Sequence, residues 1–297
     1  MEKQYAELVR RAAMFAIAVA CFLILLKAFV WWKTGSITML AAMTDSVLDL
    51  FASLVSMFVL KFALQPADEN HAFGHGKAES LAAIAQSAFI SGSAIFILLQ
   101  GFHKLTNPQL IEDSQLGILV SIISIIVTAA LVIYQKKVVK LTQSPAIQAD
   151  SLHYQTDLLM NVAILIAMVL NLFGLIYADA IFAILIALYI AFNALKMLWE
   201  AVNILLDIAL PSEEIERIVM MATKHPNIIG VHDILTRCSG AVRFIQMHLE
   251  LADHLTLLEA HDIADSLEQK ILAAFPMSEV IIHQEPTSVV QQERKKA

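Results

Sequence analysis

The sequence has little cysteine and little charge, and each shortage excludes a class of protein. Only Cys21 and Cys238 are cysteines among 297 residues, too few for the disulfide framework of a small secreted domain. Charged residues make up 16%, and the formal net charge of -7 excludes the basic excess that nucleic-acid binding requires. Hydrophobic residues make up 58% and the mean hydropathy is +0.69, which excludes a disordered chain and predicts a polytopic membrane protein.

The long apolar runs are concentrated in residues 1–210. A bilayer core about 30 Å thick is crossed by roughly 20 helical residues, and six stretches meet that length. They are Ala12–Trp32, Ile37–Leu64, Ala78–Leu105, Leu116–Tyr134, Ala146–Phe173 and Tyr177–Leu206. The short links between them predict one tightly wound transmembrane domain of six helices.

The first stretch also allows an interpretation as a cleaved signal. Arg10 and Arg11 precede the apolar run, and Val19-Ala20-Cys21 weakly resembles a lipoprotein cleavage site. The run continues to Trp32, beyond the length of a signal core, and Trp31 and Trp32 are placed as interface anchors. We therefore predict a retained spanning helix.

The basic residues beside the predicted helix ends are unevenly distributed. Eight lie on one side of the membrane: Lys3, Arg10, Arg11, Lys61, Lys77, Lys136, Lys137 and Lys140. The opposite side holds Lys33 and Lys104. The positive-inside rule then predicts that both termini are cytoplasmic. Lys27, near an outer helix end, is expected to extend its ammonium group to the interface.

The composition changes after residue 210. Residues 211–297 contain 13 acidic residues, 8 basic residues and six of the ten histidines, with no spanning segment. Helical periodicity, alternation and turn residues predict an α-β-β-α-β order. The elements are a helix at Ser212–Lys224 with Ser212 as N-cap, strands at Val231–Arg237 and Arg243–Leu251, a helix at Leu257–Phe275 and a strand at Glu279–Gln284. We predict a small cytoplasmic α+β domain at 211–297.

Two pairs of ionisable residues lie inside the apolar stretches. Asp45 and Asp49 in the second stretch, and His153 and Asp157 in the fifth, are each spaced i, i+4, so each pair shares one helix face. The two helices run in opposite directions, and Asp49 and Asp157 each lie roughly 18 Å from a helix end, so the two pairs can meet near the membrane centre. Ionisable groups there cost roughly 3 kcal/mol each.

A divalent cation would compensate this cost. One nitrogen and three oxygen ligands suit Zn²⁺, and related ions enter by geometry and availability. The competing interpretation is a set of protonated acids that hydrogen-bond between helices. Metal ligands must be deprotonated, and His153 titrates near neutral pH, so metal and protons compete for the site. Our hypothesis is proton-coupled metal antiport.

Two further groups of candidate ligands lie outside the apolar stretches. Asp68, His71 and His75 fall within eight residues of one loop and form either a weak cation site or a chance cluster. In the C-terminal domain, a three-residue turn centred on Gly240 would set His232 and His248 opposite one another, whereas a two-residue turn would shift them by one. His283 and Glu285 share a strand face. With His261 they complete the candidate set.

The D-x-x-x-D of the second stretch and the H-x-x-x-D of the fifth resemble the transport site of the cation diffusion facilitator family of metal-efflux antiporters. The resemblance extends to the six helices, to the metallochaperone-like (ferredoxin-like) C-terminal domain, and to the segments Gln65-Pro66-Ala67-Asp68, Phe73-Gly74-His75-Gly76-Lys77-Ala78-Glu79-Ser80 and Val280-Ile281-Ile282-His283-Gln284. It implies a homodimer in the bacterial inner membrane that exports Zn²⁺, Cd²⁺ or Fe²⁺ against protons, with no organic cofactor.

The resemblance also implies roles for single residues. His153 is associated with zinc and cadmium over manganese, Leu152 with a hydrophobic gate, and Lys77 and Asp207 with a charge pair that locks the protomers at the membrane boundary. Loop residues Asp68, His71 and His75 correspond to an accessory site. Glu285 stands where relatives have an aspartate that bridges two ions. Without the resemblance, Leu152 is an ordinary core leucine and the charges are solvated helix-end groups.

Two other classes of function share features with this sequence. Paired membrane aspartates also occur in intramembrane proteases, but the G-x-G-D and H-E-x-x-H patterns are absent from this sequence. A metal-sensing receptor would use the C-terminal domain and leave the mid-membrane ligands unexplained. We therefore expect a transporter and not an enzyme.

Overall fold

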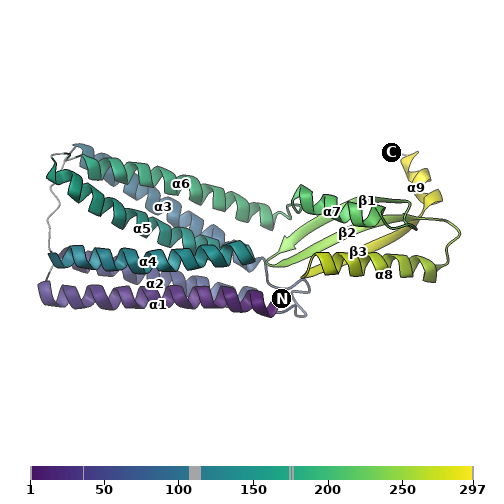
Figure 1. Cartoon of the computed structure of the whole chain (residues 1–297), viewed down its shortest axis with the longest axis horizontal. Coiled ribbons are helices and arrows are strands. Elements are labelled where there is room, and N and C mark those ends of the chain that lie inside the picture. The colour runs from purple at the N-terminus through teal and green to yellow at the C-terminus, as the bar shows by residue number, and fades with distance from the viewer. Residues whose placement is uncertain (1, 36, 107–114, 174, 176, 296–297) are drawn as a thin grey trace.

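A computed structural model describes residues 2–35, 37–106, 115–173, 175 and 177–295. The membrane part consists of α1 (Glu2–Thr34), α2 (Ile37–Ala63), α3 (Ala78–Thr106), α4 (Gln115–Thr142), α5 (Pro145–Leu172) and α6 (Ala178–Leu205). The C-terminal part consists of α7 (Ser212–Thr223), β1 (Gly230–Ser239), β2 (Val242–Leu251), α8 (Leu257–Ala274), β3 (Ser278–Pro286) and α9 (Thr287–Arg294). The helices α1–α6 run side by side along the long axis, and the C-terminal domain lies at one end (Figure 1).

Five described helices, α1 to α4 and α6, are long and apolar enough to cross a membrane. The remaining bundle helix, α5, has 28 residues but carries Asp150, His153 and Asp157. It packs against each of α1, α2, α3, α4 and α6. A polar helix is stable at this place because its neighbours surround it and satisfy its polar groups. The predicted fold of six transmembrane helices followed by an α+β domain is confirmed.

Two helices extend well beyond their apolar stretches on the side of the C-terminal domain. The helix α1 begins at Glu2, ten residues before Ala12, and α4 continues to Thr142, eight residues after Tyr134. The end of the apolar run marks where a helix leaves the bilayer, but polar residues such as Lys and Gln continue a helix in water. The extensions carry basic residues into this region.

The C-terminal domain has a three-stranded sheet with β2 in the centre. Strands β1 and β2 are antiparallel, and β2 and β3 are parallel. Alternate residues of β2 (Ile245, Met247 and Leu249) are fully buried and pack with side chains of α7 and α8, such as Ile218 and Leu267. The residues between them, including His248, therefore lie on the opposite face of the sheet.

The hairpin differs from the prediction in its turn but not in its pairing. Ser239 pairs with Val242, so Gly240 and Ala241 form a two-residue turn, and the three-residue turn is wrong. An uninterrupted ladder would then pair His232 with Leu249 on the core face. A β-bulge between His232 and Leu235, with Asp233 at a positive φ of 48°, shifts the register by one and sets His232 opposite His248.

The ends of the C-terminal helices show two smaller differences. Pro211 holds the N-cap position of α7 without a side-chain cap, so Ser212 is the first helical residue and not the cap. Thr256 and Glu259 form a capping box at the start of α8. The helix α9 was not predicted, because its polar residues carry only a short apolar pattern around Val290, which is buried.

Candidate metal centres

Three of the four predicted membrane ligands meet inside the bundle. Nε2 of His153 lies 3.0 Å from Oδ1 of Asp49 and 4.0 Å from Oδ2 of Asp157. One ligand atom from each residue lies within 4.8 Å of the others. We call Asp49, His153 and Asp157 the central cluster. None of the three residues is more than about 12 residues from the nearer end of its helix, which corresponds to roughly 18 Å along the helix axis. The cluster therefore lies well inside the bundle.

The central cluster borders a cavity of about 430 Å³, the central cavity. Asp45 also lines this cavity, one helical turn from Asp49, but it is exposed and is not part of the group within 4.8 Å among the described residues. Asp157 Oδ2 is buried and has no hydrogen-bond partner among the described residues. A buried carboxylate oxygen without a donor is costly, and a cation at this position would remove the cost.

Lys27 enters the central cavity, which the sequence did not indicate. Its ammonium group donates to the Ser46 hydroxyl at 2.7 Å and to the Ala42 carbonyl at 3.1 Å. It is half-buried and attracts the carboxylates of the cavity, and is not extended to the interface as expected. Its place depends on the rotation of α1 against α2, which residue spacing along α1 does not reveal.

A second polar network lies behind His153. The Asp150 carboxylate is buried, accepts a hydrogen bond from Gln135 Nε2 at 2.6 Å and contacts the Ser53 hydroxyl at 3.4 Å. Ser53 and the Tyr154 hydroxyl are 2.9 Å apart. This network joins α2, α4 and α5, so it fixes the orientation of the helices that carry the central cluster. Asp150 was not predicted as a functional residue, although it lies one helical turn from His153.

Leu152 does not line the central cavity. It is 8% exposed and packs with residues of α3 and α6, including Ile90, Ile190 and Met197. The residue before the histidine ligand therefore couples α5 to the α3–α6 pair. A change in that packing would move His153 directly, because the two residues are adjacent.

The loop candidates Asp68, His71 and His75 also come together, as the loop cluster. Asp68 Oδ1 accepts backbone N–H groups of His71 at 2.7 Å and Asn70 at 2.9 Å, which lowers the pKa of Asp68 and keeps it ionised. His75 Nε2 lies 3.4 Å from the other carboxylate oxygen, and its Nδ1 is buried without a partner among the described residues. The carboxylate and the two imidazoles therefore lie close enough together to bind one cation.

The same loop docks on the C-terminal domain. Phe73 packs edge-on against Phe244, and Arg237 lies over both rings. Lys77 forms an ion pair with Asp207 at 2.8 Å, and this pair is within one chain, between the start of α3 and the linker after α6. Lys77 lowers the pKa of Asp207, and Arg237 at 3.5 Å adds to the effect.

The C-terminal candidates form a row across the sheet. His232, His248 and His283 are direct neighbours on β1, β2 and β3. Glu285 is buried and contacts all three, at 3.2 Å from His232 Nε2, 3.0 Å from His248 Nδ1 and 3.4 Å from His283 Nε2. We call these four residues the sheet cluster. The bulge in β1 sets His232 opposite His248, and the pairing of β2 with β3 sets His283 on the other side of His248.

Two further residues, Asp233 and His261, differ in their position relative to the sheet cluster. Asp233, in the bulge, lies 3.4 Å from His232 Nδ1 and 3.9 Å from His248 Nδ1, and the sequence did not indicate it because its position depends on the bulge. Among the described residues, the ligand atoms that all lie within 4.8 Å of one another belong to His232, His248 and Glu285; His283 contacts this group only through Glu285, and His261 on α8 is exposed and outside it.

Family models match both parts of the chain. A cation efflux transmembrane domain matches residues 13–206, and a cation efflux protein cytoplasmic domain matches residues 210–287. The chain belongs to the cation efflux family. It is 53% identical to the cation-efflux pump FieF of Yersinia enterocolitica over 294 residues, which cover 99% of this chain and 98% of the relative. FieF of Yersinia pestis is 52% identical over the same shares. A solved structure of CzrB in its Zn form is 36% identical over 28% of this chain and 94% of that chain, with a TM-score of 0.27.

Membership of the cation efflux family determines the general function. The chain is a multi-pass membrane protein and a cation efflux transporter, and the resemblance stated from the paired motifs is confirmed. The family is one of transporters and not of classical enzymes.

Proposed function

We propose that this chain exports Zn²⁺ from the cytoplasm in exchange for protons, with Cd²⁺ and Fe²⁺ as further substrates. The transported ion binds Asp45, Asp49, His153 and Asp157. The observation that carries the proposal is the central cluster, in which an imidazole and two carboxylates converge in the middle of a membrane bundle. Asp45, one turn away in the same cavity, completes the four ligands when a side-chain rotation brings it in.

The donor set supports zinc over hard cations. One imidazole nitrogen with carboxylate oxygens is a common zinc environment, whereas Ca²⁺ and Mg²⁺ prefer oxygen ligands alone. The distances of 3.0 and 4.0 Å from His153 to its acidic neighbours leave space for an ion between them after small rotations. Cadmium and ferrous iron accept the same ligands.

Proton coupling follows from the contact between His153 and Asp49. A nitrogen and a carboxylate oxygen at 3.0 Å form a hydrogen bond only if one proton lies between them. A metal ion needs the lone pair of Nε2: a His153 protonated on both nitrogens releases one proton when the ion binds, whereas a neutral His153 only changes tautomer. In the first case a proton returns to the pair when the ion leaves on the other side, and this exchange links the two fluxes.

The direction of transport rests on orientation. The end of the bundle that carries the C-terminal domain also carries the excess of basic residues and the start of α1 (Figure 1). We propose that this end is cytoplasmic, with both termini there, and that the membrane is the bacterial inner membrane. Residues 1–210 then form the transport domain and residues 211–297 the cytoplasmic domain.

The cytoplasmic clusters serve regulation in this proposal. The transporter acts as a homodimer, and zinc at the sheet cluster stabilises one arrangement of its cytoplasmic domains. His261 and the exposed ring of His283 are available for ligation shared between two copies. The loop cluster binds an accessory ion. Leu152 acts as a hydrophobic gate through its packing against α3 and α6, and the Lys77–Asp207 pair, which forms within each chain, shapes the surface at the membrane boundary where the protomers associate.

Zinc flux in proteoliposomes tests the proposal. We expect purified full-length protein to move zinc at a rate that depends on the pH gradient, and Asp49→Asn to abolish flux. Asp179→Asn is the matched control, because Asp179 pairs with Lys104 at 2.6 Å outside the central cavity, and it should retain flux. Flux that ignores the pH gradient contradicts antiport. Absence of flux in the wild type, with zinc still bound at the sheet cluster, favours a metal sensor.

A further inference from the structure

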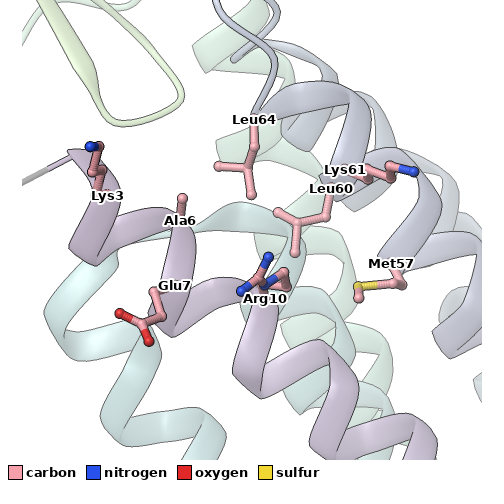
Figure 2. Close-up of a pocket in the computed structure, with 8 residues that line it drawn as sticks. All are labelled: Lys3, Ala6, Glu7, Arg10, Met57, Leu60, Lys61 and Leu64. Carbon is pink, nitrogen blue, oxygen red and sulfur yellow. The ribbon is translucent and has the colours of Figure 1, made fainter.

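A groove between α1 and α2 lies close to the C-terminal domain, and none of the residues that line it belongs to the three metal clusters. It has a volume of about 490 Å³ and is lined by Lys3, Ala6, Glu7, Arg10, Met57, Leu60, Lys61 and Leu64. Figure 2 shows Arg10 reaching from α1 toward Leu60 on α2, while the carboxylate of Glu7 points away from α2. The floor is apolar and the rim carries three cations.

The positive charge of this groove is not neutralised within the protein. Lys3, Arg10 and Lys61 are exposed, and none forms an ion pair with another described residue. The acidic member, Glu7, pairs instead with Arg11, which lies outside the groove. Three unpaired cations around an apolar floor attract an anion that also has an apolar part.

The groove lies where α1 and α2 pass from polar to apolar sequence, which is the expected level of the lipid headgroups. Arg10 precedes the apolar run that begins at Ala12, and Lys61 follows the apolar residues of α2. Deeper in the bundle, Met14, one turn from Arg10, and Leu54, two turns from Lys61, are exposed apolar side chains, 49% and 47% accessible. A phosphate at the level of Arg10 would thus continue into acyl chains that lie on Met14 and Leu54.

We propose that this groove binds an anionic phospholipid of the surrounding leaflet, with its phosphate on Arg10 and Lys61. The guanidinium group provides paired N–H donors to a phosphodiester, and Lys61 and Lys3 add charge. Basic pockets between transmembrane helices on the cytoplasmic side are suited to such headgroups. Because the bound lipid joins α1 to α2, it stabilises the helix pair that carries Lys27 and Asp49.

Native mass spectrometry of the full-length protein tests the proposal. After equilibration with equal amounts of phosphatidylglycerol and phosphatidylcholine, we expect the wild type to retain phosphatidylglycerol selectively. Arg10→Gln with Lys61→Gln should reduce that selectivity by roughly fivefold for each charge removed. Arg10→Lys with Lys61→Arg keeps both charges and should keep most of the selectivity. The readout is lipid binding, so it stands apart from any result on zinc flux.

The matched control is Lys136→Gln with Lys137→Gln. It removes two exposed charges near the C-terminal end of α4, and neither residue lines the groove. This control should retain phosphatidylglycerol as the wild type does. Equal losses in the two double variants would overturn the proposal, since the attraction would then come from general surface charge. Displacement of phosphatidylglycerol by millimolar inorganic phosphate would also overturn it, because the site would then be one for a free anion.

Discussion

Lys27 brings a fixed positive charge into the central cavity, where we propose that the transported cation binds. Its ammonium group is held by Ser46 and Ala42, both within four residues of Asp45, and it attracts Asp45, Asp49 and Asp157. In the absence of metal this charge offsets part of the carboxylate repulsion. In the presence of metal it repels the ion, so the same residue stabilises the empty protein and favours release.

Replacing Lys27 tests this double role. We expect Lys27→Gln to tighten zinc binding at the central cavity by roughly five- to tenfold, the size of a Coulomb term of roughly 1 kcal/mol across several ångströms of protein. The metal-free variant should melt at a lower temperature than the wild type. Zinc titration by competition with an indicator, and thermal unfolding with and without zinc, provide both measurements.

Lys33→Gln is the control for this prediction, because Lys33 lies near the same end of α1 over the Trp32 ring and does not line the cavity. It should leave the zinc affinity unchanged. Weaker zinc binding in Lys27→Gln would show that the ammonium group positions Ser46 and Asp45 more than it repels the ion.

Glu285 is the residue that unites the sheet cluster. Its two oxygens contact three histidines, so Glu285→Gln leaves the imidazoles without an anionic partner. We expect the zinc affinity of the sheet cluster to fall by tenfold or more, because in our proposal the carboxylate is both a ligand and a countercharge. Glu279→Gln, on the same strand, should bind as the wild type does. Calorimetric zinc titration of the full-length variants checks this, and equal affinities would remove Glu285 from the ligand set.

At the scale of elements, the candidate ligands could be predicted where local periodicity decides the geometry. The i, i+4 pairs Asp45/Asp49 and His153/Asp157 share a helix face because an α-helix has 3.6 residues per turn. Which face of one helix meets another is not local. The Lys27 contact and the Asp150–Gln135 bond depend on helix rotation, and no spacing in the sequence reveals them.

The hairpin shows how a correct pairing can follow from a wrong turn. The expected three-residue turn places one extra residue in the turn, and the observed two-residue turn with a bulge places it in β1. His232 and His248 are therefore opposite in either case. The bulge at Asp233 was not predictable because aspartate adopts positive φ in many loops without forming a bulge.

The contact between the α2–α3 loop and the β1–β2 hairpin depends on two glycines. A Cβ on Gly76 would lie 2.5 Å from the carbonyl oxygen of Ser239 and 2.8 Å from the nitrogen of Gly240. Both are backbone atoms and cannot move aside, so we expect Gly76→Ala to separate loop and hairpin at a cost of roughly 1–3 kcal/mol. Hydrogen exchange in residues 237–242 should accelerate.

Gly92→Ala is the control for this substitution. Gly92 is in α3, and an added Cβ would meet nothing within 4 Å, so the variant should keep the hairpin protected and gain a little helix stability. Unchanged hairpin exchange in Gly76→Ala would mean that the two elements are not held together in the membrane-embedded protein.

At the scale of the whole molecule, the loop cluster occupies the junction between the two parts. Asp68, His71 and His75 are on the segment that also carries Phe73, which packs on Phe244 of β2. The same strand continues to His248 of the sheet cluster. Metal at either cluster would therefore act on a shared piece of structure. Sequence spacing could indicate each cluster alone, but only the packed junction connects them.

Asp207 gives this junction a pH dependence that can be measured. Lys77 and Arg237 lower the pKa of Asp207, so the stabilisation is present above the unfolded value of about 3.9 and is lost as the pH falls through the lower folded value. The pair is 32% and 44% exposed, which limits its worth to roughly 1 kcal/mol or less. We expect wild-type residues 205–210, corrected for intrinsic rates, to exchange severalfold faster at pH 3 than at pH 5.

Asp207→Asn separates this ion pair from other acidic groups. Asparagine tolerates the positive φ of 58° at this position, so the variant removes charge without adding backbone strain. It should exchange faster than the wild type already at pH 7 and lose most of the step between pH 5 and pH 3. Glu214→Gln, which breaks a pair with Arg243 inside the C-terminal domain, should keep the step. If wild type and Asp207→Asn show the same step, the junction is held by the aromatic contacts of Phe73 and not by charge.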